Sequence, residues 1–262
     1  MNPRDVLIHL SLKYNGDYKS IRHAIEEKEY LDEEIVIPSM SCRVVTLLDD
    51  DFPEILKEFY QCPLVLYYYG DLSLIQDTSK NLAVIGTRVP TEYGSESTKE
   101  IVSEVASKVN IVSGLARGID SIAQEEALKC GGKVIAVLGS GIDVCYPPTN
   151  KKLYEEIKKK GLVISEHPSN TEPSPDKFPF RNRLIAMLSN TVLITEAYNH
   201  SGTSITASYA LAYNKNVCCV PYPRNRHSLC NSLIASGADL VEKGRDVLDV
   251  MRIDLGEEIF DL

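Results

Sequence analysis

Leu82-Ala-Val-Ile85, followed by Gly86-Thr-Arg88, is the stretch that decides the fold, because it joins a wholly apolar run to a glycine turn that carries a cation. Similar apolar runs follow at residues 110–112, 133–138, 162–164, 191–194 and 217–220. Helical patterns separate them; after the first run, Ile101, Val105 and Val109 recur at four-residue steps. Unbroken apolar strands that alternate with helices are typical of a parallel sheet covered on both faces. The sequence therefore predicts an α/β protein with an extended Rossmann-like, doubly wound, mostly parallel sheet.

The first 62 residues have a different pattern and predict a small helical N-terminal unit. Apolar residues recur there at helical spacing in three groups: Leu7, Leu10 and Tyr14, then Ile21, Ala24 and Ile25, then Phe52, Ile55, Leu56 and Phe59. The run from Leu64 to Tyr69, followed by Gly70, predicts a strand that opens the second unit. We expect the Rossmann-like domain to span residues 63–252 and residues 253–262 to form an acidic tail.

Composition and charge restrict the classes of protein to which the chain can belong. Of its 262 residues, 44% are hydrophobic and 25% are charged, as in an ordinary globular protein. No apolar run approaches the roughly 20 residues of a membrane helix, and Met1 to Asp5 lack the apolar core of a signal peptide, so we expect a cytoplasmic protein. The net charge of -9 argues against a protein that coats nucleic acid over its whole surface. Any contact with DNA is therefore expected to be local.

The seven cysteines and five histidines predict no metal site. The cysteines are odd in number and contain no C-x-x-C pair, and the histidines are dispersed. A G-x-S-x-G motif for a serine nucleophile is also missing. We expect reduced, mostly buried thiols, no bound metal and no cofactor.

Two glycine-containing loops follow the first two strands of the main domain, Gly86-Thr-Arg88 and Ser113-Gly-Leu-Ala-Arg-Gly118. In an open parallel sheet, ligands bind beyond the carboxyl ends of the strands, where helix N-termini present free amides. Glycines let these amides approach an anion, and Arg88 and Arg117 supply charge-assisted hydrogen bonds to phosphate. Tight turns with solvated arginines explain the same residues equally well. Asp120 is interpreted as a first-turn helix carboxylate rather than as a catalyst.

Two further segments are candidate ligand sites, Lys177-Phe-Pro-Phe-Arg-Asn-Arg183 and Ser201-Gly-Thr-Ser204. The first combines cations for phosphates with rings on which unpaired bases stack. The alternative is that Phe178 and Phe180 are helix-entry contacts and that the arginines are surface charges. In the second segment, hydroxyls and amides either cradle a phosphate or cap a helix, and these residues alone favour capping.

The order of these segments resembles that of one known family. The similar motifs are Ile85-Gly-Thr-Arg88, Ser113-Gly-Leu-Ala-Arg-Gly-Ile-Asp120, Ile135-Ala-Val-Leu-Gly-Ser-Gly-Ile-Asp143 with Tyr146-Pro147, Ser165-Glu166, Phe178-Pro-Phe-Arg-Asn-Arg183, Glu196-Ala197 and Ser201-Gly-Thr-Ser-Ile-Thr-Ala207. Together they are similar to the DNA-processing protein A (DprA/Smf) family over about residues 64–241. An ordered set of motifs is far more specific than one isolated glycine motif.

The resemblance implies a protein that binds and protects single-stranded DNA and helps to load RecA recombinase onto DNA that enters the cell in natural transformation. It implies no catalytic residue. Carried over to matching positions, the DNA-binding residues are Gly86, Thr87, Arg88, Ser113, Gly114, Ala116, Arg117, Gly118, Lys177, Phe178, Arg181, Asn182, Arg183, Ser201, Gly202 and Thr203. We expect the arginines among them to be exposed loop residues whose contacts with phosphate hold most of the affinity.

The resemblance also implies a homodimer formed through the C-terminal part of the Rossmann-like domain. The apolar residues there are Cys219 to Pro221, Leu229, Leu233 and Ile234, flanked by Arg224 and Arg226. Alternatively, these residues simply close the sheet. The chain departs from many relatives at Gln124, where they have a histidine, and at Cys230, where they have a glycine. The N-terminal unit resembles a shortened sterile-alpha-motif-like module, and we expect no C-terminal winged-helix domain.

An enzyme is the main alternative. Nucleotide phosphoribohydrolases of the lysine-decarboxylase-like type share this fold superfamily, but their P-G-G-x-G-T loop before a catalytic glutamate is missing here, and Glu196 instead precedes the turn at Ser201. A nicotinamide-dependent oxidoreductase would need a second and a third glycine after the first strand. We therefore expect a binding protein rather than an enzyme.

Overall fold

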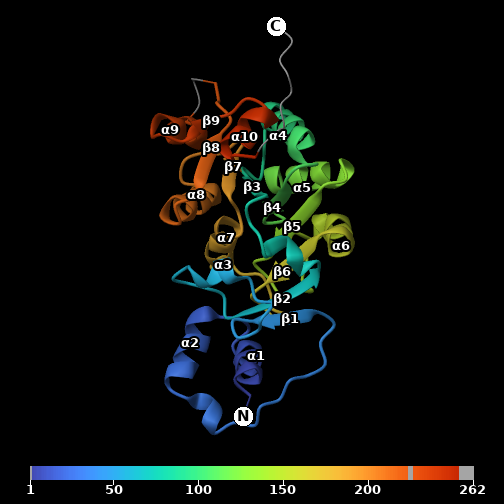
Figure 1. Ribbon diagram of the computed structural model, residues 1–262, viewed down its shortest axis with the longest axis vertical. Coiled ribbons are helices and arrows are strands. Elements are labelled where there is room, and N and C mark those ends of the chain that lie inside the picture. Colours follow the sequence, from blue (N-terminus) through green and yellow to red (C-terminus); the bar gives the residue numbers. More distant parts are fainter. Residues whose placement is uncertain (1, 224–226, 254–262) are drawn as a thin grey trace.

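The computed structural model describes residues 2–223 and 227–253, and one sheet runs through it (Figure 1). Over these residues the sheet has nine strands in the order β1-β2-β6-β5-β4-β3-β7-β8-β9. β2 is antiparallel to β1 and β6, whereas all other neighbours pair in parallel. The strands are β1 Arg43–Thr46, β2 Val65–Gly70, β3 Asn81–Ile85, β4 Asn110–Ser113, β5 Lys133–Val137, β6 Leu162–Ser165, β7 Thr191–Ile194, β8 Asn216–Cys219 and β9 Asp239–Leu240. The prediction of a mostly parallel sheet is confirmed.

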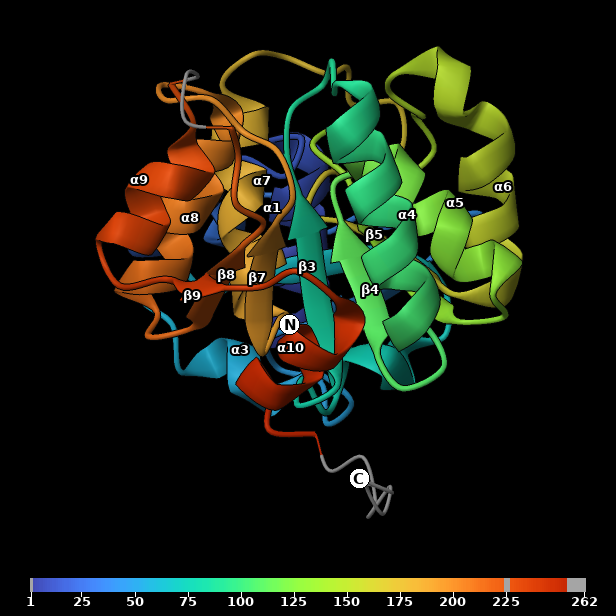
Figure 2. The same ribbon diagram turned by 90° about the horizontal axis from the view of Figure 1, so that it is seen from above.

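Helices cover both faces of this sheet. Figure 2 shows α4, α5 and α6 on one face and α7, α8 and α9 on the other. The helices are α1 Pro3–Lys13, α2 Tyr18–Glu26, α3 Glu54–Lys57, α4 Glu92–Val105, α5 Ile119–Lys129, α6 Lys151–Lys160, α7 Lys177–Met187, α8 Gly202–Ala212, α9 Leu229–Ala235 and α10 Gly244–Val250. Within the described part of the chain, no helix is both long and apolar enough to span a bilayer.

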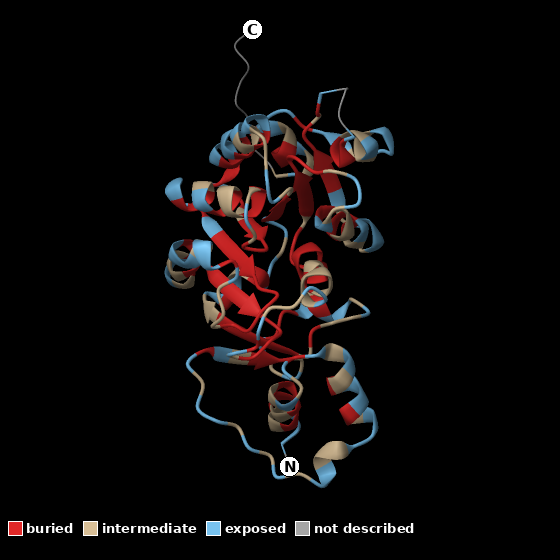
Figure 3. Ribbon diagram, turned by 180° about the vertical axis from the view of Figure 1, so that it is seen from behind, coloured by how far each residue is buried: buried red, intermediate tan, exposed pale blue. Residues whose placement is uncertain are grey.

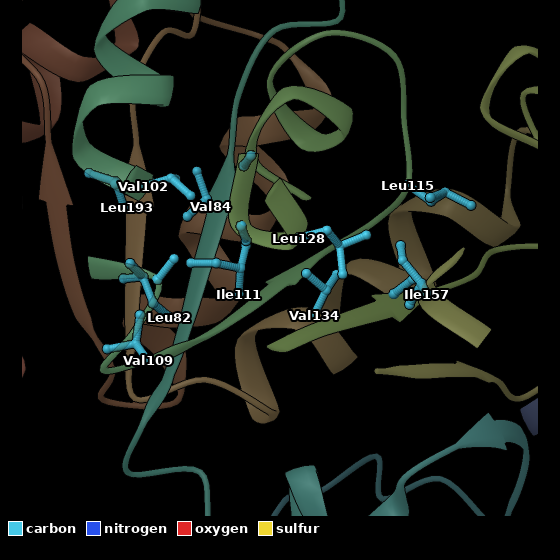
Figure 4. Packing of buried hydrophobic residues seen from close by; sticks show 14 of the residues in the cluster. Leu82, Val84, Val102, Val109, Ile111, Leu115, Leu128, Val134, Ile157 and Leu193 are labelled. Carbon is cyan, nitrogen blue, oxygen red and sulfur yellow. The ribbon is translucent and has the colours of Figure 1, made fainter. Parts of the chain in front are cut away.

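Strand β3 shows why the apolar runs carry no polar alternation. Successive side chains of a strand point to opposite faces, and both faces of β3 are covered. Leu82 and Val84 join the core cluster beneath α4 and α5, as Figure 4 shows, whereas Ala83 and Ile85 join the cluster beneath α7 and α8. Burying a side chain of this size contributes about 1.5–3 kcal/mol. A polar residue in β3 would therefore be costly on either face.

The order of the strands changes direction beside β3. From β3, the chain adds β4, β5 and β6 on one side, and α7 then leads back across the sheet to β7, which pairs with the other side of β3. α4 and α8 follow the neighbouring strands β3 and β7 and lie on opposite faces. Such a switch point opens a crevice between two loops at the carboxyl ends of the strands.

The N-terminal residues form two packed helices and an unexpected strand. α1 and α2 are capped by Asn2 and Asp17, whose side chains accept hydrogen bonds from main-chain amides in the first turn. The segment predicted as a small helical unit up to residue 62 also contains the strand β1, whose four residues give too short a pattern to identify and are held by pairing with β2. Figure 3 shows that α1 and α2 are more exposed than the sheet. The boundary at residue 62 stays a prediction, and residues 254–262 of the predicted tail lie outside the described residues.

Candidate nucleic-acid interface

A pocket of about 510 Å³ opens where the carboxyl ends of β3 and β7 meet. Its walls come from the loops after β3, β4, β5 and β7 and from helices α7 and α8. Ten of the predicted DNA-binding residues line it: Gly86, Thr87, Arg88, Ala116, Phe178, Arg181, Asn182, Ser201, Gly202 and Thr203. The fold thus brings the four predicted segments to one place.

Six of the predicted residues do not line this pocket: Ser113, Gly114, Arg117, Gly118, Lys177 and Arg183. Arg117 is exposed on the loop after β4. The Lys177 ammonium donates to the main-chain oxygen of Glu172, 2.8 Å away. The Ser113 hydroxyl is buried and donates to the main-chain oxygen of Val84, so it joins β4 to β3.

The loop after β3 presents the most accessible cation of the pocket. The Thr87 amide donates to the main-chain oxygen of Glu196 at 2.7 Å, and the Thr87 oxygen accepts from the Ile119 amide at 3.1 Å. These bonds fix the loop between β7 and the start of α5. Arg88 is exposed, and its guanidinium carbon lies 5.9 Å from the centre of the Phe178 ring. It is therefore placed to meet an anion that enters the pocket.

Arg181 differs from Arg88 because it is buried. It is 6% exposed, and its Nη1 donates to the main-chain oxygens of Gly114, at 2.9 Å, and of Val137. Burial lowers the pKa of the Arg181 guanidinium to about 10, with Asp120 opposing the shift, so the group stays charged at neutral pH. The expectation of an exposed loop arginine is wrong here, because Arg181 lies inside α7 and its bonds join the ends of β4 and β5.

Asp120 lines the same part of the pocket and lies in the first turn of α5, as predicted. Its Oδ2 accepts from the amides of Gly114, at 3.0 Å, and Ala116, at 3.4 Å. Burial raises the pKa of the Asp120 carboxyl, while Arg181 and these amides oppose the rise. A Cβ at Gly114 would lie 2.6 Å from Arg181 Nη2 and 2.9 Å from Asp120 Oδ2, so a larger residue there would displace one of these side chains.

Aromatic rings form another wall of the pocket. Phe178 and Tyr146 have ring centres 5.5 Å apart with planes inclined by 32°, and Tyr146 is 45% exposed. A flat apolar surface beside two arginines suits an unpaired base whose phosphate lies nearby. Sequence reasoning missed Tyr146 as a site residue, because nothing local indicates that it meets a ring 32 residues further on. Other lining residues that it missed are apolar or neutral: Ile85, Pro175, Pro179, Ile185, Ile205 and Thr206.

The start of α8 closes the opposite side of the pocket. Ser201 occupies the N-cap position, but its hydroxyl makes no capping hydrogen bond and is buried without a protein partner. The interpretation of Ser201 as a side-chain cap is therefore wrong. The Thr203 hydroxyl instead donates to the main-chain oxygen of Gly86 at 3.0 Å and joins the two lips of the pocket. The first amides of an α-helix have no acceptor within the helix, so this end favours an anion.

Arg183 is the clearest correction to the predicted site. Its side chain is fully buried, and its two terminal nitrogens donate to both oxygens of Glu166, each at 2.6 Å. The guanidinium also lies 3.7 Å from the centre of the Phe180 ring. Like Arg181, it belongs to α7 and not to a loop. Its hydrogen-bonding groups are committed to the protein rather than to the pocket.

The residues of the predicted dimer surface are largely buried within this one chain. Cys219 and Leu229 belong to the core cluster beneath α7 and α8, and Leu233 and Ile234 pack against it. Arg224 and Arg226 lie outside the described residues. Of the departures noted in the sequence, Gln124 donates to the main-chain oxygen of Ile135, and Cys230 is buried in the same cluster as Cys219.

The pocket therefore combines an exposed arginine, a buried arginine, a free helix N-terminus and two rings. The family model described as DNA recombination-mediator protein A matches residues 43–252. The chain belongs to this family. Among curated family members, protein Smf of Synechocystis sp. is 40% identical over 220 residues, which cover 80% of this chain and 55% of that protein. The DNA processing protein DprA of Streptococcus pneumoniae is 40% identical over 205 residues, which cover 78% of this chain and 72% of that protein. The chain thus spans about half the length of the first of these relatives.

Solved structures of recombination-mediator protein A relatives share the fold. The X-ray structure of DNA processing protein A from Streptococcus pneumoniae matches with a TM-score of 0.79 at 32% identity, covering 93% of this chain and 95% of that chain. The corresponding protein from Helicobacter pylori matches with a TM-score of 0.73 at 33% identity, covering 81% and 97%, and its structure was solved to explain a single-stranded DNA binding mode. The predicted family and the predicted Rossmann-like α/β fold are both confirmed.

Proposed function

We propose that this protein binds single-stranded DNA in the pocket between β3 and β7. The observation that carries the proposal is the position of Phe178, whose ring centre lies 5.9 Å from the guanidinium carbons of both Arg88 and Arg181. One nucleotide needs both elements, because its phosphate is bound by cations and its unpaired base by a ring. The single-stranded DNA binding mode of the Helicobacter pylori relative supports the same ligand. Arg117, exposed beside the pocket, would hold a neighbouring phosphate.

The biological role that we infer is that of a recombination mediator in the cytoplasm. The protein would protect incoming single strands, help RecA recombinase to load onto them in natural transformation, and act as a homodimer. The family description supports the mediator role. We infer binding rather than catalysis, and the position of Glu196 supports this, since the side chain is fully buried and does not line the pocket. It is thus unlike a glutamate that attacks a bound nucleotide.

Fluorescence anisotropy with a labelled oligothymidine and a duplex of equal length, each at two salt concentrations, tests the ligand. We expect clearly tighter binding of the single strand, because a duplex keeps its bases stacked away from Phe178. The salt dependence should be shallow, since few phosphates are contacted and each contributes about 0.7 to the slope of log affinity against log salt. Equal or tighter binding of the duplex would contradict the proposal.

A further inference from the structure

A buried carboxylate lies directly behind the pocket. Glu196 follows β7 and is 0% exposed. Its Oε2 accepts from the amide and the hydroxyl of Thr91, at 2.8 and 2.9 Å, and its Oε1 accepts from the Tyr198 hydroxyl at 2.9 Å. Among the ion pairs of the described residues, none involves Glu196. The carboxylate is therefore held by neutral donors alone.

These hydrogen bonds attach both ends of the loop that carries Arg88. Thr87, at the start of the loop, donates its amide to the main-chain oxygen of Glu196 at 2.7 Å. Thr91, at its end, is the N-cap of α4 and is bound by the Glu196 side chain. Arg88 lies between these two anchors. Glu196 thus binds both ends of the loop that carries Arg88.

The same carboxylate also reaches the opposite lip of the pocket. Tyr198, which donates to Glu196, lies three residues before Ser201, the N-cap of α8. The Tyr222 hydroxyl lies 2.7 Å from that of Thr91, so the segment after β8 joins the network. Glu196 is therefore the common partner of the two loops that border the crevice.

The Glu196 carboxylate occupies space that a side chain at position 94 would otherwise fill. A Cβ at Gly94, in the first turn of α4, would lie 2.0 Å from Glu196 Oε2. Removing a carboxylate from water is costly, and apolar residues often serve stability as well as a buried charged group does. A side chain that only filled space would not need to accept hydrogen bonds from Thr91 and Tyr198.

We propose that Glu196 is a positioning residue, which holds the loop of residues 87–91 in the conformation that presents Arg88 to the DNA phosphate. The proposal rests on the proposed binding of single-stranded DNA. Glu196 itself would not touch the ligand. Its contribution to affinity should pass through Arg88 and should vanish when Arg88 is removed.

A double-mutant cycle tests this relationship. Glu196→Gln keeps the shape of the side chain but replaces one of the two acceptor oxygens by an NH2 group, so the side chain can no longer accept from both Thr91 and Tyr198. We expect Glu196→Gln to weaken binding of the labelled oligothymidine about tenfold, as for coupled residues in one hydrogen-bond network. In an Arg88→Ala background, the same change should alter affinity by less than about twofold.

Glu104→Gln is the control, at an exposed carboxylate that binds the start of another helix. Glu104 accepts from the Gly244 amide at 2.7 Å, so it holds the start of α10 much as Glu196 holds the start of α4, but it lies outside the pocket lining. We expect it to leave DNA affinity unchanged. If Glu196→Gln does not fold, Thr91→Val and Tyr198→Phe each remove one hydroxyl donor to Glu196, and we expect Thr91→Val to have the larger effect on affinity.

The outcomes separate this inference from the proposed function. Folded Glu196→Gln protein with wild-type affinity would overturn the positioning role, as would an equal loss of affinity with and without Arg88. If Glu196→Gln is unfolded, full affinity in Thr91→Val would overturn it. Wild-type protein that binds no single strand would instead overturn the proposed function, and with it the ligand that this inference assumes.

Discussion

Helix α7 presents the same pair of residue types on two faces with opposite uses. Phe178 and Arg181 line the pocket, whereas Phe180 and Arg183 face the N-terminal unit, where the centres of the Phe180 and Tyr18 rings lie 5.8 Å apart. Residues two apart on a helix are separated by about 200° and point in opposite directions. Helical phase, not residue type, therefore decides which arginine of this predicted binding segment lines the pocket and which does not.

The two faces also differ in how their cations are satisfied. The rear face of α7 is the face with Phe180 and Arg183, turned away from the pocket. There Arg183 has Glu166 and the main-chain oxygen of Gln61 as partners. On the pocket face, Arg88 is exposed. Arg181 donates to main-chain oxygens, and no ion pair among residues 2–223 and 227–253 joins it to a carboxylate. Arg183 should therefore govern stability, and the exposed Arg88 should govern affinity.

Arg183→Ala should have the largest effect, and the effect should be on stability. It leaves the Glu166 carboxylate, 7% exposed, without its partner, and breaking a buried pair in this way costs about 3–5 kcal/mol. We expect a much lower midpoint of urea unfolding and unchanged DNA affinity per folded molecule. The double change Arg183→Met with Glu166→Leu should recover part of the stability. An unchanged midpoint together with lost affinity would instead place Arg183 in the ligand site.

Arg88→Ala should do the reverse on the pocket face. We expect affinity for single-stranded DNA to fall by about 1–3 kcal/mol, because a charge-assisted bond to phosphate is lost, and the salt slope to flatten by about 0.7. The unfolding midpoint should not change, since an unpaired surface arginine contributes little. Arg22→Ala is the control, because this exposed arginine lies on α2, outside the pocket. Equal effects of the two changes on affinity would show that only net charge matters.

The smallest expected effect is a pH dependence of stability that belongs to the rear face. His167 follows Glu166, and its Nδ1 lies 2.8 Å from the main-chain oxygen of Asn15. Burial lowers the pKa of His167 below its usual 6.5. Below pH 6.5 the unfolded chain therefore binds more protons than the folded chain. Stability falls as the pH is lowered from about 6.5 to the folded-state pKa of His167, and does not fall further on account of this group below that pH.

Urea unfolding of the wild-type protein and of His167→Asn, compared above and below pH 6.5, measures this contribution. We expect the wild-type protein to lose more stability on acidification than the variant does. DNA affinity per folded molecule should depend on pH in the same way in both proteins, because His167 does not line the pocket. Identical pH profiles of stability would contradict the assignment.

The sequence predicted what depends on local pattern. The apolar runs identified β2 to β8, because burial on both faces favours apolar residues in them. β1 and β9 were missed, since four and two residues carry too little pattern and are held by pairing with their neighbours. The glycine turns located the pocket, because ligand loops at a switch point need close main-chain approach.

What depends on distant partners was beyond local reasoning. The role of Arg183 is decided by Glu166, which pairs with it, and the ring of Tyr18, the first residue of α2, also lies 5.9 Å from its guanidinium carbon. The motif that contains Arg181 and Arg183 does not indicate that both side chains are buried. Similarly, Thr91 and Glu196 are 105 residues apart, and only the pairing of β3 with β7 brings them together.

The way in which the N-terminal unit meets the main domain has an evolutionary consequence. Gly16 has a φ of +74°, and a Cβ there would lie only 2.1 Å from the main-chain oxygen of Glu166. The turn that it forms also supplies the Asn15 oxygen to His167 and leads to Tyr18 against Phe180. Domain shuffling would therefore have to preserve more than a linker. A replacement module needs a left-handed glycine turn of this shape, or compensating changes both in the segment after β6 and on α7, so the two units are expected to have been inherited together.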